Sequence, residues 1–345
     1  MIALTKDFEL ESTAGAHCSR SDLEQWRSDL HYDKSKYKMI KEIQKELPRI
    51  KSNISLAKYT TFKIGGPAQY FFIAKEKKDV IEAIKMAKKN GLPFFVLGEG
   101  SNLLVSDKGF NGLVIKFQVS NFKFQDPEVV AEAGTILEEL VKGSMKRGLT
   151  GLEWAAGIPG TVGGAIRGNA AAFGSSIGNL VKRVEVLKCG EIRSLKEIGS
   201  QNQKIRIFKN KDCKFSYRDS IFKKNPNLII LAVELQIEKG DKKKIKKEIT
   251  KNLDYRKKNH PLNFPSAGSV FKNPPQFSAG FLIEKCGLKG KTIGQAQISK
   301  KHSNFIVNLG GAKAKDVKKL INLAKKKVKE KFGVELEEEL EQLGF

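Results

Sequence analysis

The sequence lacks any hydrophobic run long enough for a membrane-spanning helix. Such a helix needs about 20 consecutive apolar residues, and every apolar stretch of this chain is interrupted earlier by charged or polar residues. The N-terminus has no basic start followed by an apolar stretch, so no signal peptide is visible. We therefore expect a cytoplasmic protein without a membrane span.

Cysteine is scarce, and no metal-binding motif is present. The four cysteines, at positions 18, 189, 213 and 286, show no paired spacing, and neither Cys-x-x-Cys nor His-Glu-x-x-His occurs. These absences argue against a disulfide framework and against a structural or catalytic metal ion.

Arginine is scarce relative to lysine. The net charge is +25, yet only ten of the 63 basic residues are arginines, and the lysines occur in every region. Arginine is the side chain that reads bases and binds phosphates bidentately. We therefore expect no nucleic-acid partner, and interpret the charge as general lysine richness that also suits a cleft for an anionic small substrate.

Two nucleotide-binding motifs are incomplete. Leu103 stands where the third glycine of Gly-x-Gly-x-x-Gly would follow Gly98 and Gly100, and Lys285 stands where a phosphate loop ending at Thr292 would begin. The glycine loop 98–102 still follows a predicted strand. It is typical either of a nest of backbone N–H groups that binds phosphate or of a tight turn.

The pattern of apolar residues predicts a chain of mixed helices and strands. Residues 69–74 and 92–97 are expected to be strands, with a helix between them that Asp79 caps and Gly91 ends. The other predicted elements are a strand at 103–106, helices over 135–146, 242–257 and 317–328, and a strand with one polar face over 334–340.

Residues 1–38 differ from the rest of the chain. They hold six basic and seven acidic residues and no clear periodicity, whereas the whole chain is strongly basic. We interpret them as a disordered or non-native extension.

Three segments have compositions that suit a binding or catalytic site. Residues 265–274 carry two serines, a glycine, a lysine and an asparagine between prolines, which predicts a rigid loop or short strand that can aim a hydroxyl. Residues 151–174 hold seven glycines. Such a density of glycine is typical of a backbone that lies against a flat ring or a diphosphate, or of closely packed strands. Residues 213–220 place Tyr217 next to Arg218.

The combination of these segments resembles the UDP-N-acetylenolpyruvoylglucosamine reductase family, flavoenzymes of bacterial peptidoglycan precursor synthesis. The run AGIPGTVGGA at 156–165 is highly specific. The matches follow the family's order and cover about residues 54–344. The matching segments are 60–68, 97–107, 151–174, 213–224, 265–274, 279–287, 302–308 and 336–340.

The resemblance implies an α+β fold. Its expected parts are a two-part FAD-binding domain of the vanillyl-alcohol-oxidase (PCMH) type, with subdomains at 39–108 and 109–238, and a C-terminal α+β substrate-binding domain at 239–345. We expect a monomer that binds FAD and uses NADPH as co-substrate. The short separation of Arg218 from Ser269 resembles the subtype without an extra substrate-covering insertion.

The resemblance also implies a reaction, the reduction of UDP-N-acetylglucosamine enolpyruvate to UDP-N-acetylmuramate. Hydride passes from flavin N5 to C3, Ser269 donates a proton to C2, and Arg218 and Glu339 stabilise the enolic intermediate. A planar, permanently charged guanidinium suits the developing carboxylate charge. Glu337 is the nearest competitor for the carboxylate role, because strand alternation puts it on the face of Glu339.

Binding residues follow from the same resemblance. The substrate is expected to contact Tyr217, Lys272, Asn273 and His302. The flavin is expected to contact Gly65, Gly98, Glu99, Gly100, Ser101, Asn102, Gly157, Ile158, Pro159, Gly160, Thr161, Gly163, Gly164 and Asn169.

Two other interpretations stay open at this point. A related flavin oxidase would share the glycine-rich segment 151–174. It would not need the set of Ser269, Arg218 and Glu339, and it would turn over with oxygen. A lysine-rich nucleic-acid-binding protein would be colourless and would lose affinity steeply with salt.

Overall fold

The structure is a computed structural model that describes residues 43–118, 120–189 and 203–345. The predicted extension 1–38 lies outside the described residues. The chain divides into two units, Met1–Pro48 and Arg49–Phe345. In the first, residues 43–46 form a helical turn. Everything below concerns the second unit, whose described strands form three larger sheets and three two-stranded pairs.

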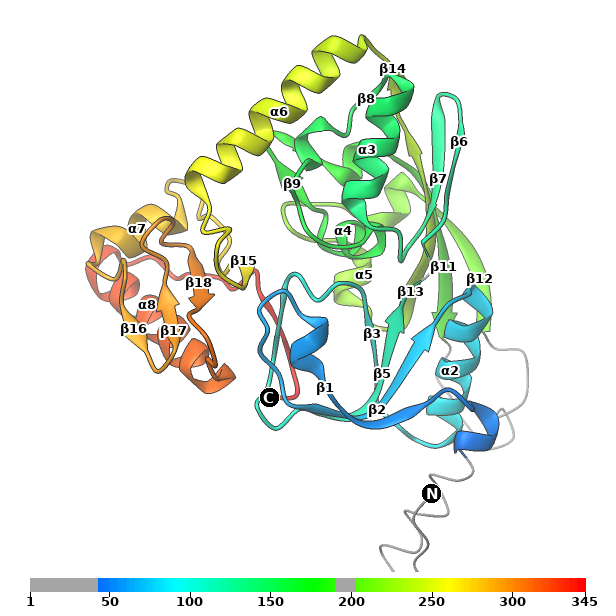
Figure 1. The fold of residues 1–345 in the computed structure, drawn as a ribbon, viewed down its shortest axis with the longest axis horizontal. Helices are drawn as coiled ribbons and strands as arrows, with labels where there is room; N and C mark the ends of the chain where they lie inside the picture. Colours follow the sequence, from blue (N-terminus) through cyan, green and yellow to red (C-terminus); the bar gives the residue numbers. More distant parts are fainter. Residues whose placement is uncertain (1–42, 119, 190–202) are drawn as a thin grey trace, which may run out of the picture. The chain divides into compact units, whose positions relative to one another are not determined.

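The first sheet has the strand order β1-β2-β5-β3, in which β1 is antiparallel to β2 and the other pairs are parallel. Helix α2 packs on β2 and β5. The predicted cap Asp79 lies instead inside the first turn of α2, where its carboxylate accepts from the N–H of Glu76 and pairs with Arg49. The elements are β1 (Lys51–Ser55), η1 (Leu56–Tyr59), β2 (Pro67–Ala74), α2 (Lys77–Lys89), β3 (Phe94–Leu97) and β5 (Phe110–Phe117) (Figure 1).

The second sheet is antiparallel throughout, with the order β12-β11-β13-β7-β6. Helix α4 packs on β13 and β7. Helix α3 begins at Leu137, two residues after the predicted start at Thr135, whose hydroxyl donates to the carbonyl of Asn121 (3.0 Å). The elements are β6 (Phe122–Gln125), β7 (Glu128–Glu132), α3 (Leu137–Arg147), α4 (Val162–Gly168), β9 (Ala171–Ala172), β10 (Ser175–Ser176), η3 (Ile177–Asn179), β11 (Val181–Cys189), β12 (Gln203–Lys209), η5 (Asn210–Cys213), α5 (Ile221–Lys224) and β13 (Leu228–Gln236).

The lysine-rich helix α6 (Lys242–Asn259) forms where the sequence predicts a helix. It packs on the short helix η2 (Glu153–Ala155), because Asn252 donates to the carbonyl of Glu153 (3.0 Å) and Arg256 to that of Ala156 (2.8 Å). Strands β8 (Leu149–Thr150) and β14 (Glu238–Lys239) pair beside it. Figure 1 shows α6 leading from the second sheet to the third.

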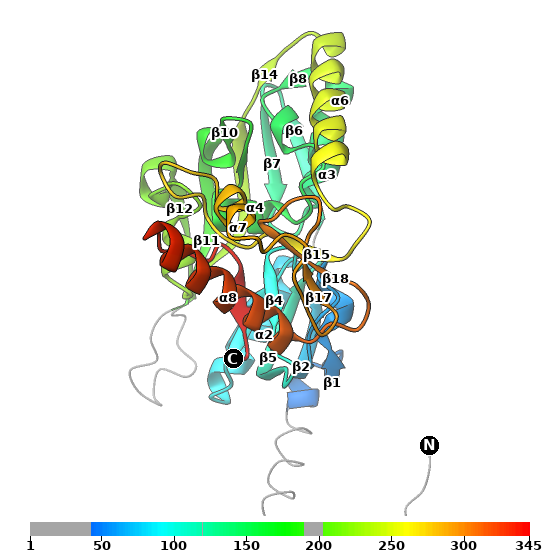
Figure 2. The ribbon, with the colours of Figure 1, turned by 90° about the vertical axis from the view of Figure 1, so that its left-hand side faces the viewer.

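The third sheet is antiparallel, with the order β15-β18-β17-β16. Helix α8 packs on β16 and β17 and contacts α7 (Figure 2). Gly333, with φ +67°, ends α8 as predicted. Apolar side chains of α8, among them Leu320 and Ile321, are buried in this core. The elements are β15 (Ser266–Ser269), α7 (Ala279–Lys285), β16 (Thr292–Ile293), β17 (Ala296–Ile298), β18 (Phe305–Asn308) and α8 (Ala314–Phe332).

The strand predicted over residues 334–340 is wrong. That stretch makes only an isolated bridge between Glu338 and Phe271, and the strand β19 (Glu341–Leu343) begins after it. β19 runs parallel to β4 (Leu103–Val105), so the chain end returns from the third sheet to the region of the first. Leu336 and Leu340 are buried in the third-sheet core, which accounts for the apolar pattern without a strand.

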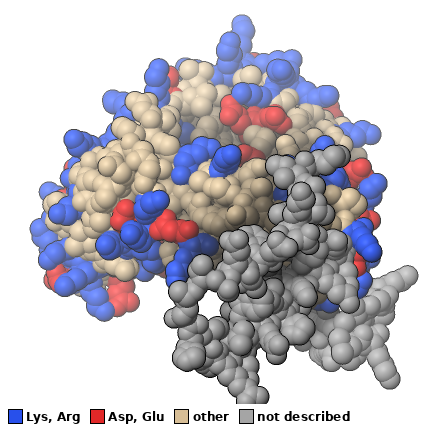
Figure 3. All heavy atoms as spheres, turned by 60° about the horizontal axis from the view of Figure 1, so that its bottom comes forward, with Lys and Arg blue, Asp and Glu red and all other residues tan. Residues whose placement is uncertain are grey.

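Among the helices of the described residues, none combines the length and apolar character that crossing a bilayer requires. On the face drawn in Figure 3, lysine and arginine side chains are scattered among acidic and uncharged ones.

Two glycines allow a test of how close packing constrains this fold. A Cβ on Gly109 would lie 1.8 Å from the carbonyl oxygen of Pro67, whereas a Cβ on Gly91 would meet nothing within 4 Å; both have positive φ, +81° and +62°. We expect Gly91→Ala to cost about 1–2 kcal/mol for the left-handed backbone alone. Gly109→Ala should cost about 1–3 kcal/mol more, because its methyl group collides with backbone. Urea unfolding of both variants measures the difference, and equal losses would contradict it.

Candidate functional site

A cleft of about 590 Å³ lies within the second unit, and most of the predicted site residues line it. Its walls come from the loop after β3, the loop before α4, the strand β15 and the segment before β19. The predicted residues that line it are Gly98, Glu99, Gly100, Ser101, Asn102, Gly157, Ile158, Pro159, Gly160, Thr161, Gly164, Arg218, Ser269, Asn273 and Glu339.

Three residues predicted to contact the flavin do not line this cleft. A Cβ on Gly65 would lie 2.9 Å from that of Val105, and one on Gly163 would lie 2.7 Å from that of Ala133, so both glycines serve close packing. Asn169 donates to the carbonyl of Ser216 (2.8 Å) and thereby holds the loop that carries Arg218.

Three residues predicted to contact the substrate also lie outside the lining. The hydroxyl of Tyr217, a residue 54% exposed, accepts from the backbone N–H of Asn273 (3.3 Å). Lys272 pairs with the exposed Glu337. The ring of His302 lies 5.6 Å from that of His260, centroid to centroid. Tyr217 and His302 therefore each contact a residue that does line the cleft.

The loop 98–102 offers backbone donors of the kind that a phosphate group requires. Within the described residues, the N–H groups of Glu99, Gly100, Ser101 and Asn102 donate no hydrogen bond. The buried Lys116 of β5 donates to the carbonyl of Gly98 (2.7 Å) and pairs with Glu99. The loop is thus held from its carbonyl side while its N–H groups stay available for an anion.

The glycines of the two cleft loops let the loops contact each other directly. A Cβ on Gly98 would lie 2.6 Å from Oγ1 of Thr161, and a Cβ on Gly160 would lie 2.8 Å from Oγ of Ser101. Gly164 and Gly168 leave further room along α4. Bare backbone from both sides of one cleft, with unused N–H donors, fits FAD, whose diphosphate and flat ring need close approach to the main chain.

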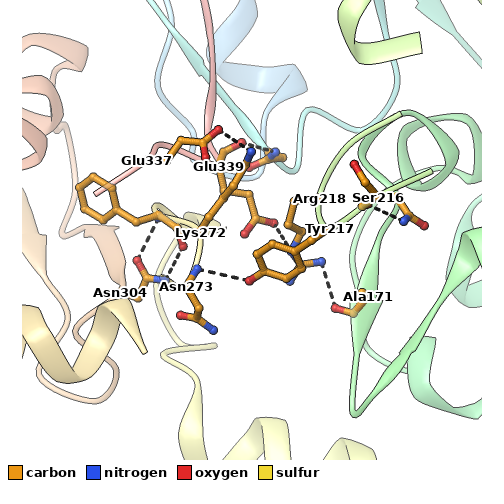
Figure 4. A network of polar contacts seen from close by, with 12 residues as sticks. Ala171, Ser216, Tyr217, Arg218, Lys272, Asn273, Asn304, Glu337 and Glu339 are labelled. Carbon is orange, nitrogen blue, oxygen red and sulfur yellow. Dashed lines mark hydrogen bonds and ion pairs between the residues drawn. The ribbon is translucent and has the colours of Figure 1, made fainter. Parts of the chain in front are cut away.

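Arg218 is fixed in the cleft by contacts at both ends of its guanidinium (Figure 4). Its Nη1 donates to the carbonyl of Ala171 (3.0 Å), and its Nε lies 3.0 Å from Oε1 of Glu339. This second contact is an ion pair and not a hydrogen bond, because the buried Nε lacks a hydrogen-bond partner in the described residues. Arg218 has φ +55°, a costly conformation for a residue with a side chain and one that clusters at functional sites.

The structure separates the two competing glutamates. Glu339 lines the cleft and faces Arg218, with a side chain 16% exposed, whereas the side chain of Glu337 is 70% exposed and pairs with Lys272 (Figure 4). Burial raises the pKa of Glu339, and the positive charge of Arg218 opposes that rise only in part. Glu339 can therefore exchange a proton at a higher pH than an ordinary glutamate.

Ser269 ends β15 and faces the same cleft. The residue before it, Gly268, has φ +77°, and the pairing of β15 with β18 is irregular between Ser266 and Ser269. The next residue, Val270, accepts the N–H of Glu339 at its carbonyl (2.8 Å). One main-chain hydrogen bond therefore links the segments that carry the serine and the glutamate.

Charged residues that were not predicted as site residues from the sequence also line the cleft. Arg256 donates to the carbonyls of Ala156 and Trp154 (2.8 and 3.2 Å), and it forms no ion pair with a described carboxylate. Burial, with the charge of Arg218 adding to it, lowers its pKa. The unpredicted lining residues with polar or charged side chains include Arg167, Lys223, Tyr255, Arg256, His260, Ser266 and Glu341.

His260 is a neutral member of this lining. Burial, together with the charges of His302, Arg256 and Lys301, lowers its pKa to about 4. It therefore presents an uncharged imidazole near neutral pH.

Comparison with family models matches two parts of the chain. Residues 68–195 match the model of a FAD binding domain, and residues 260–343 match the model of the UDP-N-acetylenolpyruvoylglucosamine reductase C-terminal domain. The expected α+β fold, with a FAD-binding domain followed by a C-terminal domain of this family, is confirmed.

Whole-chain comparisons agree with the family models. The UDP-N-acetylenolpyruvoylglucosamine reductase of Caldanaerobacter subterraneus is 42% identical over 306 residues, which cover 88% of this chain and 97% of that protein. The reductase of Alkaliphilus oremlandii is 43% identical over 314 residues, or 90% and 99% of the two chains. The crystal structure of the Thermus caldophilus reductase aligns with a TM-score of 0.68 at 33% identity, over 86% of this chain and 99% of that one.

Identity above 40% across nearly the full length of such relatives goes well beyond a shared fold. This chain belongs to the UDP-N-acetylenolpyruvoylglucosamine reductase family and is a FAD-binding oxidoreductase.

Proposed function

We propose that this chain reduces UDP-N-acetylglucosamine enolpyruvate to UDP-N-acetylmuramate with NADPH as reductant, in the synthesis of a peptidoglycan precursor. One observation carries the proposal. Ser269, Arg218 and Glu339 come from three distant parts of the sequence and line one cleft, which the loops 98–102 and 157–161 also line. A flavin oxidase of the same fold would not need this set.

The cofactor and the substrate would share this cleft. The free N–H groups of loop 98–102 and the bare backbone at Gly160 and Gly164 would hold FAD. When bound, FAD supplies the redox chemistry by which hydride from NADPH reaches C3 of the enolpyruvyl group. The substrate's diphosphate would suit the cationic lining from Lys223 and Arg256.

Arg218 would bind the enolpyruvyl carboxylate. Hydride addition at C3 moves negative charge onto that carboxylate, and a fixed guanidinium stabilises charge that develops beside it. Arg218 is held in place by Ala171 and Glu339, so little reorganisation is needed when the charge appears. It keeps its own proton, because a guanidinium stays charged.

Ser269 would donate the proton to C2, and the carboxylate of Glu339 would offset part of the positive charge of Arg218. The Ser269 hydroxyl makes no hydrogen bond to another described residue, so it is available to a ligand in the cleft. Proton transfer by a positioned group contributes about 10²–10⁴-fold to a rate. The reaction then adds one hydride and one proton across the carbon–carbon double bond.

The overall proposal is tested with the purified protein and its absorbance. NADPH should bleach the yellow flavin under anaerobic conditions, and the enolpyruvyl sugar should restore the colour while UDP-N-acetylmuramate forms. Recolouring by oxygen alone, with no response to the enolpyruvyl sugar, would identify an oxidase and contradict the proposal.

Replacement of Ser269 separates the two halves of the reaction. In Ser269→Ala we expect NADPH to bleach the flavin at the normal rate and the sugar to reoxidise it about 10²-fold more slowly, since only the second step needs the proton. Stopped-flow absorbance measures both steps. Ser176→Ala, at a serine of β10 outside the cleft lining, is the matched control. Normal reoxidation of Ser269→Ala would rule out the serine as proton donor.

Exchange of Arg218 tests the need for a planar cation. Arg218→Lys retains the charge but loses the fork that holds a carboxylate, so reoxidation by the sugar should slow by about 10²-fold. Arg147→Lys, an exchange at an arginine that stacks on Phe124 outside the cleft lining, controls for general effects. An unchanged rate in Arg218→Lys would show that point charge suffices.

The raised pKa of Glu339 predicts a pH dependence. The rate of reoxidation by the sugar should change with a midpoint above the ordinary range of a glutamate, because burial disfavours the ionised form. Glu339→Gln should slow the step and remove this titration, while Glu337→Gln should leave both rate and profile unchanged. Single-turnover rates across pH measure this, and loss of the titration in Glu337→Gln instead would reverse the assignment.

A further inference from the structure

A second guanidinium–carboxylate pair lies in the cleft beside the pair of Arg218 and Glu339. Arg167, at the end of α4, donates from Nη1 to Oε1 of Glu341, the first residue of β19. Both side chains line the cleft, and they are 35% and 23% exposed. The two partners are 174 positions apart in sequence, so no local pattern predicts the contact.

The main chain around Glu339 is hydrogen-bonded on two sides. Its N–H donates to Val270 on the side of the third sheet (2.8 Å). On the other side, the amide of Asn102 donates to the carbonyl of Glu339 (3.0 Å), and the N–H of Glu341 donates to the carbonyl of Asn102 (3.1 Å). Glu339 itself lies outside any strand. On this second side, its position depends on how firmly β19, which begins two residues later, is held.

Arg167 contacts both flanks of the catalytic ion pair. Its side chain holds Glu341, two residues after Glu339, and its carbonyl accepts from the hydroxyl of Ser220 (2.7 Å), two residues after Arg218. A single residue of α4 thus contacts the segment of each partner.

The pair of Arg167 and Glu341 also affects the charge around Glu339. Glu339 and Glu341 are two carboxylates lining one cleft, and each faces its own guanidinium. Without Arg167, Glu341 would be an unpaired negative charge close to Glu339 and would compete for Arg218. A like charge in the same cleft makes the ionised form of Glu339 less favourable.

We propose that Arg167, acting with Glu341, is a positioning residue for the Arg218–Glu339 pair. It holds β19 and the loop that carries Arg218 in position relative to each other, and it keeps Glu341 from competing for Arg218. This inference rests on the proposed function, since it concerns the step in which the enolpyruvyl sugar is reduced. The alternative role for Arg167 is a direct contact to a phosphate of FAD or of the sugar nucleotide.

The experiment compares Arg167→Met, Glu341→Gln and the exchanged pair R167E/E341R, with Arg147→Met as control. It measures FAD affinity of the apo-protein, and single-turnover reoxidation by the enolpyruvyl sugar across pH. We expect unchanged FAD affinity in all variants, because the proposal gives neither Arg167 nor Glu341 a contact with the cofactor. Reoxidation should slow by about tenfold in Arg167→Met, as expected for a misplaced catalytic group.

The pH profile of reoxidation distinguishes the proposed role from a general loss of structure. In Arg167→Met the midpoint should move upward relative to Glu341→Gln, which has no unpaired carboxylate, and the exchanged pair should recover most of the rate. Weaker FAD binding or a raised KM for the sugar in Arg167→Met, with Glu341→Gln normal in both, would assign Arg167 as a ligand and overturn the proposal. A normal rate and profile in Arg167→Met would also overturn it. A wild-type flavin that the sugar fails to reoxidise would instead contradict the proposed function itself.

Discussion

The contact between Arg218 and Glu339 is the constraint on which the site depends. It joins the loop 213–220, held by Asn169 beside the second sheet, to the chain that leaves the third sheet. Taking both charges partly out of water is unfavourable unless each keeps its partner. The pair therefore favours the arrangement in which the two segments meet, and that arrangement also brings Ser269 to the same cleft.

The electrostatics of the cleft follow from how its charges are matched. Glu99, Glu339 and Glu341 each pair with a basic side chain, Lys116, Arg218 and Arg167 respectively. Arg256 is bound only to backbone carbonyls, and Lys223 has no ion pair among the described residues. The cleft consequently keeps a positive excess, which attracts anionic nucleotides and steers their approach.

Local signals in the sequence predicted the parts of the site that depend on backbone. The glycines near 98 and 160 are required because a side chain there would collide with the facing loop, and glycine is visible in any sequence. The end of α8 was predictable because Gly333, with φ +67°, adopts the left-handed conformation that ends a helix. The strand over 334–340 was wrong, because burial of Leu336 and Leu340 against a distant core produces the apolar alternation of a strand, although the segment forms only an isolated bridge.

Side chains that act across long sequence separations could not be predicted in this way. Arg167 and Glu341 meet only because β19 returns to β4. Neither residue lies in a local sequence pattern that indicates this contact. The same holds for Arg256, which reaches the cleft because α6 packs on η2. The resemblance placed Tyr217 and His302 near the substrate, and the structure puts each beside a lining residue and not in the lining itself.

The most direct measurement is a crystal structure of the oxidised protein with the enolpyruvyl sugar bound. The account predicts the enolpyruvyl carboxylate on the guanidinium of Arg218 and C2 within about 3.5 Å of the Ser269 hydroxyl oxygen, the separation at which a positioned group reacts. A bound sugar whose carboxylate lies away from Arg218, or a Ser269 hydroxyl turned out of contact with C2, would contradict it.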